Sequence, residues 1–276
     1  MRNLLSTKDQ RQLRLMETLI QHRDWMKLHE LADELGCTER ILKSDLNELR
    51  AAFPTIDIQS SVNGIMIDLE VNTSVEDVYQ YFLAHSQSFR LLEYMFFNEG
   101  LPIYRTIENL HSSNANLYRL GRNITKTLST QFQIELSFTP SEIRGNEIDI
   151  RYFFAQYFSE RYYFLDWPFP DLPEEDLTEF ADFFYKITNY PMRFSIYRMY
   201  KLMIAISIYR IKSGHFVDLP NHFNDEYYPL LMSIPNFEEI LVHFSEKLGL
   251  EITPDIIAQI FISFIQNNLF LDPQEF

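Results

Sequence analysis

The sequence predicts a mainly α protein in three parts, and three observations lead to that prediction. Apolar residues recur at helical spacing along most of the 276-residue chain. Two short stretches of alternating apolar residues, each placed after a helical pattern, predict β-hairpins. Three prolines between positions 168 and 173 then forbid a helix and precede an acidic run. We therefore predict domains at residues 1–70, 71–164 and 165–276.

Composition excludes several classes of protein. Hydrophobic residues make up 46% and charged residues 23% of the chain, which is typical of a folded globular protein. The 7 glycines are dispersed, which excludes a glycine-rich phosphate-binding loop. The single cysteine, Cys37, allows no internal disulfide. Because the chain shows neither a signal-peptide pattern nor an apolar run of about 20 residues, we expect a cytoplasmic protein with no membrane contact.

The net charge of −15 is unevenly distributed. The three predicted domains carry −3, −2 and −10 in chain order. Between Glu108 and Glu135 there is no acidic residue, although Arg119, Arg122 and Lys126 lie inside that window. Since solvated helices normally intersperse both signs, this basic window favours contact with phosphate groups.

The first domain has the pattern of three helices followed by a hairpin. Apolar residues repeat at helical spacing over 13–20, 28–35 and 42–53, and Thr38 is placed to cap the third helix. Alternating residues at 55–59 and 65–69, with Asn63-Gly64 between them, predict a hairpin, or wing. A short turn before the third helix, with a polar face on that helix, is typical of a winged helix-turn-helix, which places this helix in the DNA major groove. The predicted DNA-facing residues are Arg40, Lys43, Ser44 and Asn47.

The second domain repeats this order. A long helix or helix pair over 75–96 precedes a short helix over 103–110 and a longer one that begins near Ser113. Segments 134–137 and 143–148 are predicted as a second wing, with Gly145-Asn146, between Ile143 and Ile148, as its turn residues. We expect this domain to supply more of the DNA affinity, because three acids, Glu39, Asp45 and Glu48, flank the polar face of the first. The predicted DNA-facing residues here are Tyr118, Arg119, Arg122 and Lys126.

No pattern of an enzyme site is readable. The 7 histidines include no pair at helical metal-ligand spacing and no His-Glu-x-x-His. A Gly-x-Ser-x-Gly elbow is also absent. Paired-carboxylate chemistry is the one enzyme class that the pattern leaves open. We therefore expect no enzyme, no metal and no cofactor.

At this point the sequence resembles a known family. Residues 31–49 resemble the first helix-turn-helix of the Mga/AtxA-like family of Gram-positive transcriptional regulators. Residues 112–119 and 143–153 are similar to the family's second, Mga-type helix-turn-helix and its closing signature. The resemblance covers essentially the whole chain. It implies two winged helix-turn-helix domains followed by an all-α helical-bundle regulation domain of the sugar phosphotransferase system.

This resemblance implies a DNA-binding transcriptional regulator. Its expected partners are double-stranded DNA, phosphotransferase-system proteins and a second copy of the chain. We expect the homodimer to use aromatic residues of the third domain, among them Phe261, Phe264 and Phe270. Two alternatives stay open, a winged-helix protein-interaction scaffold and an RNA-binding antiterminator-like regulator, although A-form grooves do not admit a recognition helix. The family pattern continues with further domains, so we interpret the sequence as a fragment or a short member.

The resemblance also implies a regulatory residue. His215 lies where the first phosphorylatable histidine of the regulation domain tends to be, with Arg210 and Lys212 as the nearest cations in sequence. The residue pattern alone also allows an ordinary helix end, because Gly214 is placed as a C-terminal cap and the helix dipole stabilises a cation beside it. His222 and His243 are the next candidates.

Overall fold

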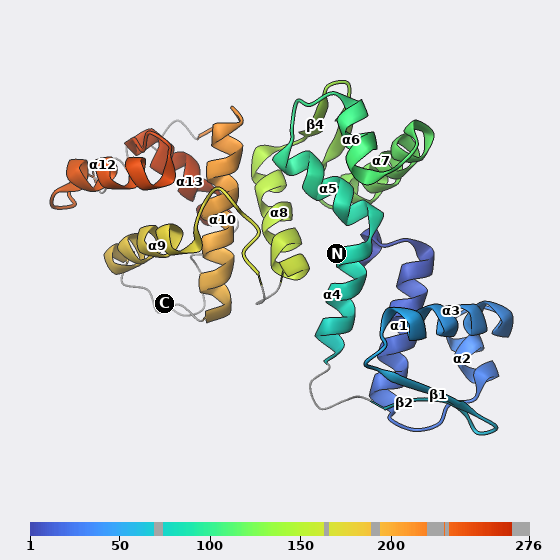
Figure 1. The fold of residues 1–276 in the computed structure, drawn as a ribbon. Coiled ribbons are helices and arrows are strands. Elements are labelled where there is room, and N and C mark those ends of the chain that lie inside the picture. The colour runs from blue at the N-terminus through green and yellow to red at the C-terminus, as the bar shows by residue number, and fades with distance from the viewer. Residues whose placement is uncertain (69–73, 163–165, 189–193, 220–228, 230–231, 267–276) are drawn as a thin grey trace. The chain divides into compact units, whose positions relative to one another are not determined.

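The structure is a computed structural model that describes residues 1–68, 74–162, 166–188, 194–219, 229 and 232–266. The chain forms two compact units, residues 1–92 and 93–276 (Figure 1). Helices dominate both units, and the described residues of each hold one two-stranded antiparallel sheet. The predicted mainly α fold is confirmed. The division into three domains stays a prediction.

Three helices build the core of the first unit: α1 (Thr7–His22), α2 (Leu28–Glu34) and α3 (Glu39–Ala52). Ser6 and Thr38 cap α1 and α3, because their hydroxyl oxygens accept hydrogen bonds from the backbone N–H groups of Asp9 and Ile41. The three helices predicted from apolar spacing are therefore present, and so is the predicted cap at Thr38. Their buried side chains include Leu13, Met16, Leu19, Leu31, Leu42, Leu46 and Leu49.

The first wing consists of β1 (Asp57–Ser61) and β2 (Gly64–Asp68). Their antiparallel register leaves Val62 and Asn63 as a two-residue turn, so the predicted turn was wrong by one position. Gly64 instead begins β2 with a φ of +129°, where a Cβ would lie 2.0 Å from the carbonyl oxygen of Met26. Glycine is required here because the backbone of Met26 pairs with the start of the strand.

Two consecutive helices follow, α4 (Val75–His85) and α5 (Gln87–Phe97). Ser74 and Asp77 form a capping box at the start of α4. α4 packs against α1, and the ring of Tyr81 lies with its centroid 4.5 Å from that of Phe53. Residues 75–92 therefore pack within the first unit.

A second set of two helices and a wing opens the second unit: α6 (Ile103–Leu110), α7 (Asn114–Ser129), β3 (Glu135–Phe138) and β4 (Ser141–Arg144). Ser113 caps α7, because its hydroxyl oxygen accepts a hydrogen bond from the backbone N–H of Asn116. The predicted helices at these positions are thus present. They are followed by their wing in the same order as in the first unit.

The predicted bounds of the second wing were wrong. Its turn lies at Thr139-Pro140 rather than Gly145-Asn146, and its second strand ends at Arg144. The side-chain oxygen of Asn146 accepts a hydrogen bond from the backbone N–H of Ile148 at 2.9 Å, so this asparagine begins a helix instead of turning a hairpin. An Asn beside a Gly is compatible with both roles.

The rest of the second unit is a helical bundle of α8 (Glu147–Tyr162), α9 (Glu174–Thr188), α10 (Phe194–Lys212), α12 (Phe237–Leu248) and α13 (Pro254–Gln266). α10 packs against α8, α9 and α13 (Figure 1). Aromatic rings fill the space around α8, where the ring of Phe96 contacts those of Phe154, Phe158 and Phe169. The predicted bundle is confirmed. None of the described helices is long and apolar enough to cross a membrane.

Candidate nucleic-acid interface and the polar network around His215

α3 keeps one polar face in solvent. Its predicted contact residues are all exposed: Arg40, Lys43, Ser44 and Asn47. Leu42, Leu46 and Leu49 on the opposite side are at most 2% exposed, so the packing of the unit fixes which face is presented. Their contact with DNA stays a prediction.

Two of the three acids on α3 do not compete with these cations. The carboxylate of Asp45 is 2% exposed and lies 2.6 Å from Nε of Arg11 on α1. Glu48 pairs with Lys8 and accepts a hydrogen bond from Gln12 at 3.0 Å, and the hydrogen bond from Lys8 contributes most to lowering the pKa of Glu48. Glu39 differs, because its carboxylate lies 3.7 Å from Nζ of Lys43.

Arg50 joins α3 to the first wing, a role that the sequence did not indicate. Its Nε donates to the carbonyl oxygen of Ile58 at 2.9 Å, and its guanidinium also reaches the hydroxyl of Ser60. A third contact, 3.3 Å long, leads from Nη1 to the side-chain oxygen of Asn47. Arg50 therefore orients one predicted contact residue and holds the wing beside its helix.

α7 presents the more basic face. Tyr118, Arg119, Arg122 and Lys126 are exposed, and at about 100° per residue they lie within one band of the helix surface. Within the part of the chain that the structure describes, no ion pair involves the three cations. Arg119 donates to the side-chain oxygen of Asn116 at 2.7 Å, which holds it near the start of the helix. The positive charge of this face is therefore not neutralised by a nearby carboxylate.

The second wing packs directly on α7. A Cβ at Gly121 would lie 2.4 Å from the ring of Phe138 on β3, so only glycine leaves room for that ring. The ring of Tyr118 meets the same phenylalanine edge to face, with centroids 5.2 Å apart. One predicted contact residue is thereby held by the wing.

His215 follows the end of α10. The backbone N–H of His215 donates to the carbonyl of Arg210, and that of Gly214 to the carbonyl of Ile211, each at 2.9 Å. With Gly214 at a φ of +86°, these are the two bonds of a Schellman cap. The predicted C-terminal cap is present, and it places the imidazole beside the helix end.

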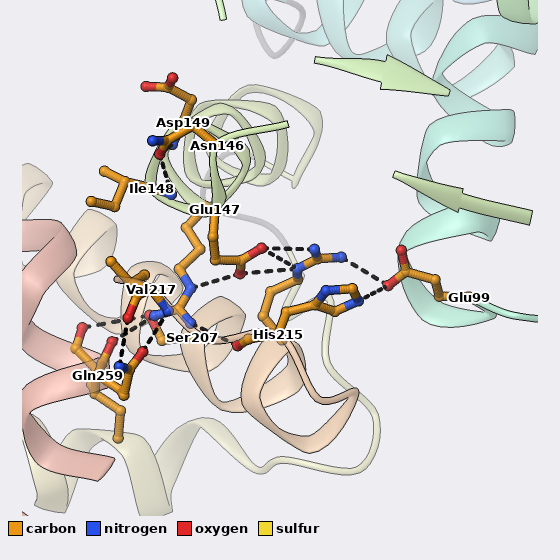
Figure 2. A network of polar contacts seen from close by, with 12 residues as sticks. Glu99, Asn146, Glu147, Ile148, Asp149, Ser207, His215, Val217 and Gln259 are labelled. Carbon is orange, nitrogen blue, oxygen red and sulfur yellow. Dashed lines mark hydrogen bonds and ion pairs between the residues drawn. The ribbon is translucent and has the colours of Figure 1, made fainter. Parts of the chain in front are cut away.

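The imidazole of His215 belongs to a network of charged groups (Figure 2). Its Nε2 lies 2.7 Å from Oε2 of Glu99, and Nη1 of Arg210 lies 2.8 Å from the same oxygen. The opposite edge of the Arg210 guanidinium binds Glu147, with Nη2 2.7 Å from Oε2. Arg151, fully buried, donates to Glu147 and to the backbone carbonyl of His215 at 2.9 and 3.2 Å.

Burial and pairing act in opposite directions on Glu147. Burial raises the pKa of its carboxyl, but the hydrogen bonds and charges of Arg210 and Arg151 outweigh it and lower the pKa below the ordinary value of 4.5. Glu147 is therefore ionised at neutral pH, with two arginines bound to it. The sequence contains one signal for this network, because Glu147 and Arg151 are separated by one helical turn, the spacing of an ion pair on a helix.

The other residues that the sequence named together with His215 are Lys212, as a cation partner, and His222 and His243, as alternative phosphorylation candidates. Lys212 donates to the carbonyl oxygen of Leu248 at 2.8 Å, so Arg210 is the cation beside the imidazole. His243 is exposed and pairs with Glu179 at 2.8 Å. His222 lies outside the described residues.

The expected dimer surface is only partly described. The ring of Phe261 stacks on that of Phe180, with centroids 6.1 Å apart, and it is partly buried in the bundle. Phe270 and the side chain of Phe264 lie outside the described residues. The homodimer therefore stays a prediction.

A metal site is not formed by the described residues. Among them, no group of three or more His, Cys, Asp or Glu side chains is arranged to hold a metal ion. What the geometry offers instead is two exposed polar helix faces, each beside a wing, and one partly accessible histidine in a balanced charge network. These features suit binding and regulation of binding.

Comparison with known proteins gives three matches that follow one another along the chain. Residues 6–65 match the M protein trans-acting positive regulator (MGA) HTH domain, and residues 71–158 match the Mga helix-turn-helix domain. Residues 173–276 match the PRD domain of the same regulator. All three parts therefore indicate one family.

Two relatives agree with these matches. The chain is 42% identical, over 277 residues and 100% of its length, to a Streptococcus pneumoniae serotype 4 protein named "Putative trans-acting regulator". It is 24% identical, over 211 residues and 74% of its length, to the Bacillus anthracis "Capsule synthesis positive regulator AcpA". The alignments cover 56% and 43% of these two proteins, so the chain spans about half the length of the relatives it matches.

Proposed function

Because this chain belongs to the Mga family of trans-acting regulators, we propose that it is a transcriptional regulator that binds double-stranded DNA through α3 and α7. The observation that carries the proposal is the exposed face of α7. Three cations without a carboxylate partner among the described residues lie there beside an exposed tyrosine. Such a face suits phosphate contacts together with base contacts.

Duplex DNA fits this arrangement better than RNA does. The B-form major groove is about 12 Å wide and admits an α-helix, whereas the deep, narrow groove of A-form RNA does not. The two wings flank the helices that would enter such grooves. The alternative function, a scaffold that contacts only other proteins, does not explain why the sequence around Arg119 and Arg122 lacks acidic residues.

A gel-shift titration with genomic fragments at two salt concentrations tests DNA binding. Wild-type protein is expected to shift specific duplex fragments, with an affinity that falls as salt rises. Double-stranded RNA of the same sequence serves as competitor and separates the antiterminator-like alternative. The variant Arg119→Ala/Arg122→Ala is compared with Lys247→Gln, which changes a bundle cation paired with Glu179. Equal binding by wild type and the double variant contradicts the proposal.

The proposed regulation is phosphorylation of His215 by a phosphohistidine protein of the phosphotransferase system. Because a carboxylate oxygen can only accept, we assign the ring proton of His215 to Nε2, which faces Glu99, and the lone pair to Nδ1, which is then the nucleophile. In the transfer the Nδ1–P bond forms, the P–N bond of the donor phosphohistidine breaks, and its electron pair returns to the donor ring. The imidazole is 32% exposed, so a donor has access to it.

Incubation with the general phosphotransferase components and phosphoenolpyruvate tests this step. Label is expected on His215 and absent from a His215→Gln variant. Label found only on another histidine contradicts the assignment. Sedimentation at micromolar concentration, with and without label, measures the proposed homodimer in the same samples.

A further inference from the structure

The two carboxylate oxygens of Glu99 bind two different parts of the second unit. Oε1 accepts a hydrogen bond from the backbone N–H of Ile143 on the wing strand β4, at 2.9 Å. Oε2 accepts from Arg210 at 2.8 Å and from His215 at 2.7 Å. Because the Glu99 side chain is only 10% exposed, these contacts take the place of water. One side chain therefore joins the end of α10 to the second wing.

The contact to the wing is reinforced by the neighbouring backbone. The N–H of Gly100 donates to the carbonyl oxygen of Ser141, at 2.7 Å, so the segment that carries Glu99 lies along the edge of β4. The wing strand β3, paired with β4, carries Phe138, which packs on Gly121 of α7. A displacement of Glu99 thus acts on the element that supports the proposed recognition helix.

The charges around His215 are balanced while its imidazole is neutral. Among the described residues, Glu99 comes from the segment after α5, Glu147 and Arg151 from α8, and Arg210 from α10, while α13 contributes the neutral Gln259. Since Lys212 is bound to a carbonyl oxygen away from the imidazole, Arg210 is the cation for which a new anion at His215 would compete. Its Nε and Nη2 are held by Glu147, which leaves Nη1 as the contested donor.

We propose that Glu99 is a positioning residue that transmits the charge of the His215 side chain to the second wing. A negative group at position 215 binds Nη1 of Arg210 and repels the carboxylate of Glu99. The N–H of Ile143 then loses its acceptor, and the β3–β4 wing loosens on α7. The inference deepens the proposed regulation at His215 and rests on it for its biological role, but the coupling itself needs neither DNA nor a phosphoryl donor.

Amide hydrogen exchange in the full chain measures the coupling directly. His215→Glu places a carboxylate where the proposal needs an anion, and exchange of the Ile143 amide is expected to rise about tenfold or more. His215→Gln is the matched control, because a neutral amide still donates to Glu99 and leaves exchange unchanged. His243→Glu is the second control, since this exposed histidine also pairs with a glutamate, Glu179, in a different part of the bundle.

A swap of the charged and the neutral side chain between positions 99 and 215 separates this role of Glu99 from a merely structural one. In Glu99→Gln alone the amide oxygen accepts from Arg210, which turns the NH₂ group toward the N–H of Ile143, so exchange at Ile143 is expected to rise. In Glu99→Gln/His215→Glu the new carboxylate binds Arg210, the amide oxygen accepts from Ile143, and exchange is expected to return to the wild-type rate. Such non-additivity is the signature of direct coupling.

Three results overturn the proposal: unchanged exchange at Ile143 in His215→Glu, a rise matched in α9 and α12, or no restoration in the double variant. DNA affinity is measured on wild type and on the same five variants. If exchange at Ile143 is restored in Glu99→Gln/His215→Glu but none of the proteins binds DNA, the coupling is supported and the proposed function is contradicted. If wild type and His215→Glu bind DNA with the same affinity, and exchange at Ile143 is also the same in both, the coupling is contradicted but the proposed DNA binding is kept.

Discussion

Phe138 of β3 lies so close to Gly121 of α7 that a methyl group on Gly121 would come within 2.4 Å of its ring. Gly121→Ala is therefore expected to displace the second wing from the proposed recognition helix and to destabilise the second unit by about 1–3 kcal/mol, the usual cost of overpacking. Urea unfolding followed by far-UV circular dichroism measures the loss.

The matched variants separate overpacking from helix propensity. Asn123→Ala changes an exposed position of the same helix and is expected to alter stability by less than about 0.5 kcal/mol. Phe138→Leu combined with Gly121→Ala makes room for the methyl group and should recover part of the loss. A Gly121→Ala protein as stable as wild type would show that the wing adjusts without cost.

The network between α1 and α3 gives a second prediction. Arg11→Ala leaves the carboxylate of Asp45, which is 2% exposed, without its cation. We expect a loss of about 3 kcal/mol in the first unit, because removal of one partner leaves a buried charge uncompensated. Lys8→Ala is the control, since its pair with Glu48 is exposed on both sides and is worth about 0–1 kcal/mol. Equal losses in the two variants would contradict this interpretation.

The sequence predicted best what depends on neighbours along the chain. The exposed faces of α3 and α7 follow from apolar residues repeated once per turn, and the helix starts at Thr38 and Ser113 from local side-chain chemistry. The second wing was placed wrongly because Asn146 is equally suited to a turn and to a helix start.

Long-range partners were beyond the reach of the sequence. Asp45 was interpreted as an acid that weakens the DNA-facing surface of α3, but its partner Arg11 lies 34 residues earlier. Glu99 meets His215 across 116 residues, and nothing in the spacing of either residue indicates the other. The histidine itself was found by resemblance and Arg210 by its place in the sequence, whereas the position of Glu99 and Glu147 beside them was found only from the fold.

The lowered pKa of Glu147 predicts a pH dependence of stability. In the folded chain this pKa lies below the ordinary value of 4.5, so between the two values the unfolded chain binds more protons than the folded one. Stability from this group is therefore full above about pH 4.5 and is lost as the pH falls through the folded pKa. Urea midpoints of the second unit, measured from pH 7 downward, are expected to decrease below that point.

Glu147→Gln is the variant that isolates this contribution. It keeps the size of the side chain but removes the titrating group, so the midpoint is expected to be lower at pH 7 and to fall less steeply in acid. Glu179→Gln is the control, because its pairs with Lys247 and His243 are exposed and solvent screens them. Parallel pH curves for wild type and Glu147→Gln would contradict the assignment.

The relative weight of the two helices in DNA binding is the last prediction. The cations of α7 have no carboxylate partner among the described residues, whereas Lys43 on α3 faces Glu39 at 3.7 Å. Arg119→Ala or Arg122→Ala is expected to cost about 1–3 kcal/mol where the arginine reads a guanine edge, with relaxed specificity at that base pair. An arginine that contacts only phosphate should instead lower the salt slope by about 1 and leave site preference unchanged.

The matched substitutions on α3 are Lys43→Ala and Asn47→Ala, measured on the same DNA fragment at the same two salt concentrations. A smaller loss of DNA affinity is expected than for the α7 variants, because Glu39 offsets the charge of Lys43. Asp45 and Glu48 do not add to this effect, since both are bound to residues of α1. Arg50→Ala adds a distinct case, since it frees the first wing and the side chain of Asn47 together. If the α3 variants lose more affinity than the α7 variants, the face of α3 is the principal DNA contact and the acid-free window of α7 is not.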